Sequence, residues 1–348
     1  MRLTRPWPVL LALAALAVSA GCGATDSTAA SKTGPATELR LGYFANVTHA
    51  GPVYGVGTGI YQRYLGQTQL KTQVFSAGPA AVEALFAGAV DAAYVGPSPA
   101  INAFVRSKGD VVLVAGATSG GASLVVKAGI ADAQALRGKT IADPQTGGTQ
   151  DIALRSYLKG HGYAEDAQGA GDVKIVAQEN SVTLDLFQQG KIDGAWVPEP
   201  WASRLVLDGG GRVLVDEKSL WPQGRFVTTN LLVKKSFLRS HPETVKALLR
   251  AQVEADKQIV ADPAHAQQVV NDQLKALTGK ALRPEVIARA FQQVTVTEDP
   301  LAATLKEAAD HAFGTGLVKK ADLKGIYDLT LLRQVLGKDV DDAGLGEG

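Results

Sequence analysis

The stretch Gly88-Ala89-Val90-Asp91-Ala92-Ala93-Tyr94-Val95 has a second copy further along the chain, Gly190-Lys191-Ile192-Asp193-Gly194-Ala195-Trp196-Val197. The shared pattern is G-x-[VI]-D-x-A-aromatic-V, and the two glycines are 190 − 88 = 102 positions apart. A helix is expected before each copy, over 80–87 and 181–189, so each glycine stands where a left-handed residue ends a helix. Agreement at Gly, Asp, Ala, the aromatic residue and Val favours two similar lobes over a chance match between two helix-to-strand turns.

Strands and helices alternate around the two copies, which indicates an α/β fold. The pairs Asp262-Pro263 and Asp299-Pro300 each place an N-cap before a proline at the first helical position. From 242 to 336 the chain is expected to be almost entirely helical. The strands expected outside the repeat are 39–44, 111–117, 124–127, 139–142 and 231–233.

Four loops are expected to face one another across a cleft, because ligands of α/β sheets gather at the carboxyl ends of the strands. These loops are 45–50 and 96–99 in the first lobe, and 143–149 and 198–201 in the second. They are rich in glycine and small polar residues and contain no Arg or Lys. Helix N-termini add unsatisfied N–H donors and partial positive charge. The pattern favours reversible binding of a sulfonate, sulfate or carboxylate by neutral donors.

Several loop residues have a second, structural interpretation. Ser98 and Thr149 are candidate ligand contacts and also ordinary N-caps. His49 can donate to an anion or have a purely structural role. Trp196 matches Tyr94 of the first lobe, so the two rings could close on an apolar ligand tail, or they could belong to the core. Glu199 could accept from a ligand amine or brace its loop.

Bulk composition excludes several classes of protein. The chain has 348 residues, enough for two domains, and is 46% hydrophobic and 20% charged. A formal net charge of +1 gives no broad field for nucleic acid. The single cysteine, Cys22, excludes disulfides and cysteine-ligated metals in the folded part. We find no catalytic motif and no metal-ligand spacing among the five histidines, so we expect no enzyme activity, metal or cofactor.

The N-terminus has the layout of a secretory signal over 1–21: a basic start, a short apolar run and small residues. Cys22 follows directly, which resembles the lipobox of bacterial lipoproteins, although Ser19 stands where that box usually has Leu. The other interpretation is a small buried residue in an uncleaved N-terminus. Residues 22–37 are expected to be the lipidated Cys and a flexible linker, and 337–348 a flexible tail.

Four stretches resemble the aliphatic sulfonate, taurine and nitrate substrate-binding proteins of ABC importers, most closely the sulfonate branch. They are Leu41–Ala50, Tyr94–Asn102, Gln150–Arg155 and Asp193–Trp201. The resemblance runs from about 39 to about 336. It implies a type II periplasmic-binding-protein fold, in which two α/β lobes joined by two crossing strands close on the ligand.

The resemblance implies that lobe one consists of residues 38–123 and 229–336, and that lobe two consists of residues 124–228. The chain would capture an aliphatic sulfonate or similar small organic anion outside the cell, as a monomer lipid-anchored to the membrane. It would then deliver the anion to an ABC permease and its ATPase. The implied ligand-binding residues are Asn46, Thr48, His49, Ser98, Gly120, Gly121, Thr149, Gln150, Trp196 and Glu199.

Other functions stay open from the sequence. The ligand could be nitrate, or a nitrogen-containing ring such as a thiamine-pyrimidine precursor held between Tyr94 and Trp196. An enzyme on the same fold is a further alternative. Pyrimidine-synthase relatives carry a cysteine-rich motif that this chain lacks.

Overall fold

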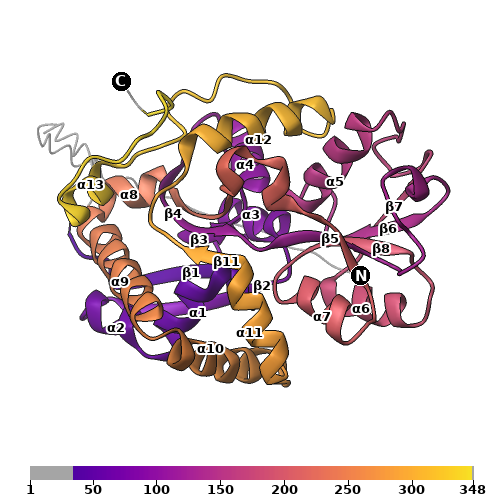
Figure 1. Cartoon of the computed structure of the whole chain (residues 1–348). Helices are drawn as coiled ribbons and strands as arrows, with labels where there is room; N and C mark the ends of the chain where they lie inside the picture. Colours follow the sequence, from indigo (N-terminus) through magenta and orange to yellow (C-terminus); the bar gives the residue numbers. More distant parts are fainter. Residues whose placement is uncertain (1–33, 347–348) are drawn as a thin grey trace, which may run out of the picture. The chain divides into compact units, whose positions relative to one another are not determined.

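The computed structural model describes residues 34–346, so the predicted signal, Cys22 and most of the linker lie outside the described residues. The described chain forms two β-sheets, each with helices packed against it (Figure 1). In spatial order, the first sheet contains β11 (Val294–Val296), β4 (Val111–Gly120), β10 (Val227–Lys234), β3 (Ala92–Val95), β1 (Glu38–Phe44) and β2 (Gln69–Phe75). The second contains β7 (Lys174–Ala177), β6 (Thr140–Asp143), β8 (Gly194–Pro198), β5 (Ala122–Val126) and β9 (Arg212–Asp216).

The helices of the first lobe come from both ends of the described chain, and those of the second from its middle. The first-lobe helices are α1 (Ala50–Gly57), α2 (Ile60–Leu65), α3 (Gly78–Phe86), α4 (Pro97–Ser107), α8 (Lys235–Ser240), α9 (Pro242–Ala261), α10 (Pro263–Thr278), α11 (Pro284–Gln293), α12 (Ala302–Gly314) and α13 (Thr330–Leu336). The second-lobe helices are α5 (Thr149–Gly160), α6 (Asn180–Gln188) and α7 (Trp201–Leu207).

The chain passes between the sheets twice. It leaves the first sheet at the end of β4 and enters the second at the start of β5, with only Gly121 between the two strands. It returns between β9 and β10, over residues 217–226. Each lobe is thus an α/β unit of its own, which confirms the expected fold class.

The sequence repeat occupies equivalent places in the two lobes. Gly88 and Gly190 end α3 and α6 with φ angles of 72° and 71°, a left-handed conformation that glycine adopts without steric cost. The Asp91 carboxylate then accepts from the backbone N–H of Arg40 at 2.9 Å, and the Asp193 carboxylate accepts from that of Thr140 at 2.8 Å. Each aspartate therefore fixes the start of the parallel strand beside it, β1 or β6.

The two sheets also share one strand order. β10-β3-β1-β2 in the first corresponds to β5-β8-β6-β7 in the second. In both sheets the first strand of this series is antiparallel and the other three are parallel to one another. The repeated sequence pattern therefore corresponds to the same strand order and direction in both lobes, as predicted.

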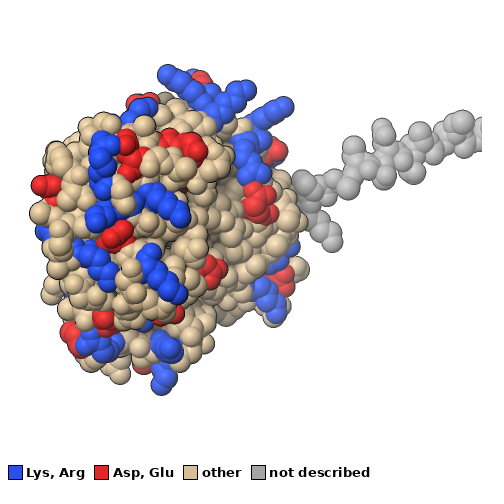
Figure 2. Space-filling model, turned by 90° about the vertical axis from the view of Figure 1, so that its right-hand side faces the viewer, with Lys and Arg blue, Asp and Glu red and all other residues tan. Residues whose placement is uncertain are grey.

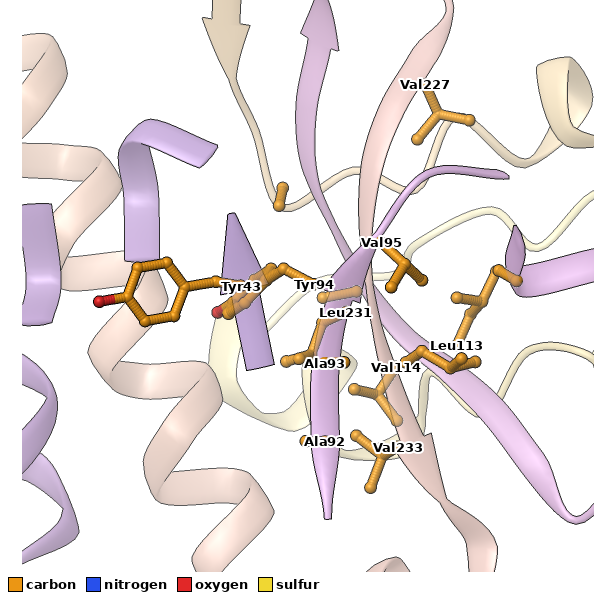
Figure 3. Packing of buried hydrophobic residues seen from close by; sticks show 14 of the residues in the cluster. Tyr43, Ala92, Ala93, Tyr94, Val95, Leu113, Val114, Val227, Leu231 and Val233 are labelled. Carbon is orange, nitrogen blue, oxygen red and sulfur yellow. The ribbon is translucent and has the colours of Figure 1, made fainter. Parts of the chain in front are cut away.

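Burial on both faces explains why the inner strands of the sheets are almost continuously apolar. In the second lobe, Leu124 and Val126 of β5 pack with Trp196 and α5, whereas Val125 between them packs with α6 and α7. Successive side chains of a strand point to opposite faces, so one sheet separates two apolar clusters. Figure 3 shows the same alternation in the first lobe, where Tyr94 and Val95 lie on opposite sides of β3.

Two of the predicted helix features differ from the structure. The Asp262 carboxylate accepts from the N–H of His265 at 3.0 Å and caps α10, as predicted. Asp299 does not cap a helix in this way: its carboxylate accepts from the N–H of Leu301, and α12 begins only at Ala302. The stretch 242–336 is also less helical than expected, because it contains β11 and an irregular segment after α12.

The segment 337–346 is packed, in contrast to the flexible tail expected there. Val340 and Leu345 are buried, and the guanidinium of Arg333 donates to the carbonyl of Val340. The carbonyl of Leu345 accepts from the N–H of Gly325 at 2.9 Å. Two buried apolar side chains together with these hydrogen bonds thus hold the segment on the first lobe.

Candidate functional site

A pocket between the lobes lies where loops and helix starts meet at the carboxyl ends of the strands. We call it the cleft pocket; its volume is about 440 Å3 with its open mouth included. Five of the predicted site residues line it: Asn46, Thr48, His49, Thr149 and Gln150. The other lining residues are Phe44, Ser76, Ala77, Gly78, Gly96, Pro99, Pro144, Gly148, Asn180, Pro198, Thr228 and Thr229.

The N-termini of four helices border the cleft pocket, two from each lobe. α3 begins at Gly78 and α6 at Asn180, while Gly96 and Gly148 are the N-caps of α4 and α5. None of the four ends has a side-chain hydrogen bond to its cap. The first N–H groups of a helix have no intrahelical acceptor, and the helix dipole adds partial positive charge. The pocket is therefore built to receive hydrogen bonds and negative charge.

Three side chains of the cleft pocket carry buried polar atoms without a partner among the described residues. They are Nε2 of His49, Oγ1 of Thr149 and Oδ1 of Asn180. A buried polar atom without a hydrogen bond costs about 1–3 kcal/mol, so such atoms normally have a partner. Three of them around one pocket indicate a polar ligand.

His49 is held as a neutral ring. Its imidazole packs on Phe44, with the ring centroids 4.3 Å apart, and its Nδ1 lies 3.3 Å from Oγ1 of Thr48. Burial lowers the pKa of His49 to about 3, and the Tyr94 backbone offsets this only in part. The Thr48 hydroxyl can donate to Nδ1, which leaves the ring proton on Nε2, the atom without a partner.

No Lys or Arg is among the residues that line the cleft pocket. On the surface shown in Figure 2, by contrast, Lys and Arg are mixed with Asp and Glu. An anion in the pocket would therefore be held by uncharged N–H and O–H donors.

Two acidic residues, Asp143 and Asp151, flank the loop before α5. The Asp151 carboxylate accepts from the N–H of Gly147 at 2.7 Å and pairs with Arg155 at 2.6 Å. Burial, followed by the charge of Asp151, raises the pKa of Asp143 above its ordinary value. Asp151 itself forms an ion pair with Arg155.

Comparison with known protein families places the chain in one of them. The model of the NMT1-like family matches residues 32–272. The chain belongs to the NMT1-like family. This confirms the family resemblance read from the sequence.

Named relatives of this NMT1-like chain are binding proteins. It is 33% identical over 190 residues to the taurine-binding periplasmic protein of Escherichia coli (strain K12), covering 54% of this chain and 57% of that protein. It is 24% identical over 338 residues to a putative aliphatic sulfonates-binding protein of Bacillus subtilis (strain 168), covering 94% and 96%. The first match thus spans little more than half of that relative, and the second nearly all of it.

A solved structure confirms the fold. The alkanesulfonate-binding protein SsuA of Xanthomonas axonopodis pv. citri, bound to MOPS, superposes with a TM-score of 0.66 at 23% identity. The superposition covers 82% of this chain and 95% of that one. The expected periplasmic-binding-protein fold is therefore confirmed for the NMT1-like chain.

The structure separates Ser98, Gly120 and Gly121 from the cleft pocket of the NMT1-like chain. Ser98 is buried and lines a second, smaller cavity beyond Thr149. Gly120 and Gly121 are the crossing between the sheets, with φ angles of 77° and 81°. A Cβ on Gly121 would lie 2.4 Å from Cγ1 of Val294, so this glycine is required by close packing.

Glu199 braces its loop, one of the two roles open from the sequence. Its side chain is buried and accepts from the N–H of Ser203 at 3.0 Å. Burial raises its pKa, and the bonds to Ser203 oppose that rise. The carbonyl of Glu199 also accepts from the N–H of Val47 at 3.1 Å, which joins the loops of the two lobes.

Tyr94 and Trp196 do not close on a common ligand, so that hypothesis is wrong for this structure. Tyr94 is fully buried in lobe one, and its hydroxyl lies 2.9 Å from both Tyr61 Oη and Gln252 Oε1. Trp196 is fully buried in lobe two, and its Nε1 donates to Glu217 at 2.8 Å. Tyr94 thus lies beside residues of α2 and α9, and Trp196 lies beside Tyr157 of α5, with the ring centroids 5.6 Å apart. A ring ligand between them therefore has no site.

Asn180 and the segment 76–78 were missed in the sequence. The signal was present in the repeat: the offset of 102 that relates Gly88 to Gly190 also relates Gly78 to 78 + 102 = Asn180. Extending the alignment back to the start of the preceding helix would have placed both residues at the cleft.

Neither a metal centre nor a membrane span is found in the described part of the chain. Residues 34–346 contain no group of three or more His, Cys, Asp or Glu side chains placed to hold a metal ion. No helix among them is both long enough and apolar enough to cross a bilayer.

Proposed function

We propose that this protein is an extracytoplasmic solute-binding protein that captures an aliphatic sulfonate, or a similar small organic anion, and delivers it to an ABC importer. The observation that carries the proposal is the cleft pocket, where four uncapped helix N-termini from two lobes meet three unpartnered polar atoms. The names of the relatives support the same ligand class.

A sulfonate fits this chemistry because its single negative charge is spread over three acceptor oxygens. Neutral donors satisfy such a group without a permanent ion pair. His49 and Thr149 would supply side-chain donors, and the Asn180 amide can donate through its nitrogen. Because no Lys or Arg lines the pocket, we expect the anion to be released readily when the lobes part.

Capture and release would follow from movement of the lobes. We take lobe one as 38–123 plus 229–336 and lobe two as 124–228, with the two crossings as hinges. A ligand that contacts both lobes stabilises the closed state over the open one. The bond from Trp201 Nε1 to Asn46 Oδ1, at 3.0 Å, and the bond from Val47 to Glu199 would form on closure.

The same proposal gives the chain its partners and location. A permease would receive the ligand from the closed form, and a separate ATPase would drive transport. Acylation of Cys22 would hold the monomer on the outer face of the membrane, and a tether raises the effective concentration of the trap near its permease.

The direct test is calorimetry of the purified protein against ethanesulfonate, taurine, sulfate, nitrate and acetate. We expect at least one sulfonate to bind more tightly than sulfate and acetate. Replacing His49 by Ala should weaken that binding about tenfold or more, because a buried donor to the anion is lost. The exposed Glu83→Gln change serves as control and should leave binding unchanged. No binding to any sulfonate would refute the proposal, and turnover of a bound sulfonate, followed by mass spectrometry, would indicate an enzyme instead.

A further inference from the structure

One helix of lobe two is bonded to lobe one at both of its ends. α7 begins at Trp201, whose Nε1 donates to Oδ1 of Asn46 in lobe one at 3.0 Å. Its C-cap is Asp208, whose carboxylate accepts from Nη2 of Arg283 in lobe one at 2.6 Å. α7 and α11 accordingly lie side by side where the lobes meet (Figure 1). The helix is therefore a point of contact between the lobes in addition to the two crossings.

The contact between Asp208 and Arg283 lies in a groove that both lobes line. The groove has a volume of about 1410 Å3 with its open mouth included, and its walls are α6 and α7 of lobe two and α10 and α11 of lobe one. No residue lines both this groove and the cleft pocket. An anion held in the cleft pocket would therefore contact neither Asp208 nor Arg283.

The side chain of Arg204 connects the two ends of α7. Its Cζ lies 4.7 Å from the centroid of the Trp201 ring, and its Nε lies 3.3 Å from Oδ2 of Asp208. Positions 201, 204 and 208 recur every three or four residues, so these side chains lie on one side of the helix. A guanidinium over an indole and an ion pair one turn apart both stabilise this arrangement. We call Trp201, Arg204, Asp208 and Arg283 the α7 latch.

The ion pair of the α7 latch can separate without leaving an unpaired charge. Asp208 also pairs with Arg204, within lobe two. Arg283 also pairs with Glu285, within lobe one. The side chains of Asp208 and Arg283 are 21% and 50% exposed, so water can replace the lost bond. An ion pair of this kind changes an equilibrium constant by about fivefold or less, which suits a contact that forms and breaks with each cycle of binding.

A bond between the lobes acts on ligand binding through the equilibrium between the open and closed forms. When only the closed form binds, the apparent Kd is the intrinsic Kd divided by the fraction of the protein that is closed. The bond between Asp208 and Arg283 requires α7 to lie against α11, so it increases that fraction. It also has to break before the lobes part, so it slows the release of the ligand.

We propose that Asp208 and Arg283 are positioning residues for ligand capture, whose bond holds α7 of lobe two against α11 of lobe one and so tightens anion binding without touching the anion. The inference rests on the proposed function and adds to it two affinity-determining residues outside the anion site. It implies that salt weakens retention of the anion through this ion pair, although no Lys or Arg lines the cleft pocket.

A double-mutant cycle with ethanesulfonate tests the proposal. Asp208→Asn and Arg283→Gln each remove one charge and nearly keep the shape of the side chain. Calorimetry in 20 mM NaCl should show each single variant binding about three- to fivefold more weakly than the wild type. The double variant should bind no more weakly than either single variant, because the bond is already lost. Single variants that bind like the wild type, or losses that multiply in the double variant, would overturn the proposal.

Two further readouts separate a positioning role from a structural one. The dissociation rate of ethanesulfonate, followed by stopped-flow tryptophan fluorescence, should rise in Asp208→Asn by about the same factor as the Kd, while the urea midpoint of the unliganded protein stays unchanged. In 1 M NaCl the affinities of the wild type and Asp208→Asn should come to within about twofold, because salt screens the exposed pair. A loss of affinity matched by a loss of stability, or one that persists in full at 1 M NaCl, counts against the latch.

Glu83→Gln is the matched control, because Glu83 pairs with Arg106 at 2.5 Å within lobe one and both side chains are exposed. It should change neither the affinity nor the effect of salt, and a loss equal to that of Asp208→Asn would overturn the assignment to the lobe contact. Wild-type affinity in every latch variant refutes the latch but leaves the proposed function standing. No binding of any sulfonate by the wild type refutes both.

Discussion

Tyr94 and Trp196 occupy equivalent positions in the two lobes and have different roles. Tyr94 lies in lobe one among Tyr61 and Gln252, none of which lines a cavity between the lobes. Trp196 lies equally deep in lobe two, yet its indole N–H donates to Glu217, a residue that lines the second, smaller cavity beyond Thr149. In one lobe the ring thus bonds only within its core, and in the other it bonds to a residue that lines a cavity.

The comparison shows how two lobes of the same topology can differ at one position of a repeated sequence. The Gly and Asp of the repeat are the same in both copies, because the left-handed turn and the carboxylate that bonds to the strand start have no close substitute. The aromatic position only needs a large ring against a helical layer. The polar atom of the ring can therefore bond within the core in one lobe and to Glu217, at the second cavity, in the other.

The largest expected effect tests whether Tyr94 and Trp196 contribute independently to the free energy of unfolding. Tyr94→Ala and Trp196→Ala should each lower the free energy of unfolding by about 3–5 kcal/mol, because each opens a cavity in a closed core. Since the rings lie in separate cores, the double variant should lose the sum of the single losses to within about 0.5 kcal/mol. Urea denaturation followed by circular dichroism measures all three. Strong non-additivity would mean that the lobes share more of their packing than the structure shows.

The next prediction concerns Glu217, the buried carboxyl group to which Trp196 donates. Burial raises the pKa of Glu217 to about 7 from its ordinary 4.5, although the indoles of Trp196 and Trp221 oppose the rise. Between these values the folded protein keeps a proton that the unfolded chain releases, so Glu217 lowers stability as the pH rises. The difference amounts to about 3 kcal/mol at pH 8.

Glu217→Gln removes this titration while keeping an acceptor for Trp196. Relative to the wild type, the variant should therefore gain about 3 kcal/mol in unfolding free energy between pH 4.5 and pH 8. Urea midpoints of both proteins at several pH values give the difference directly. A wild-type-minus-variant difference that stays constant with pH would contradict the buried carboxyl described here.

The next prediction compares Asp91 and Asp193, the aspartates of the two copies of the repeat. Asp91→Ala should cost about 2 kcal/mol and Asp193→Ala about 1 kcal/mol, because both lose an acceptor for a strand N–H but only Asp91 also pairs with Arg40. The extra loss is small because the Arg40 side chain is 41% exposed and solvent screens the pair. Thermal unfolding at 0.1 M and 1 M salt should bring the two losses closer together at high salt.

Features that depend on neighbours in sequence were predictable, and those that depend on partners across the fold were not. Gly88 and Asp91 could be read directly, since the turn and the strand start are a few residues apart. The edge strand β2 was missed because it is mostly exposed and shows no apolar alternation. Whether Tyr94 and Trp196 face a ligand or the core stayed open, because it depends on which sheet face each ring meets. Even so, the four loops expected from the strand ends all line the cleft pocket, although 76–78 and Asn180 also line it and were not predicted.

The smallest expected effect compares two hydroxyls that the sequence could not tell apart. Thr149 borders the cleft pocket with an unpartnered Oγ1, whereas Ser98 is buried and lines the second, smaller cavity beyond it. Thr149→Val should weaken ethanesulfonate binding by about 1 kcal/mol, or about fivefold, while stability stays equal or rises because a buried unpaired hydroxyl is removed. Ser98→Ala should leave ethanesulfonate binding within about twofold, since the hydroxyl lies outside the anion site. Calorimetry with ethanesulfonate distinguishes the two hydroxyls. A larger loss of affinity in Ser98→Ala than in Thr149→Val would mean that the anion binds in the second, smaller cavity and not in the cleft pocket.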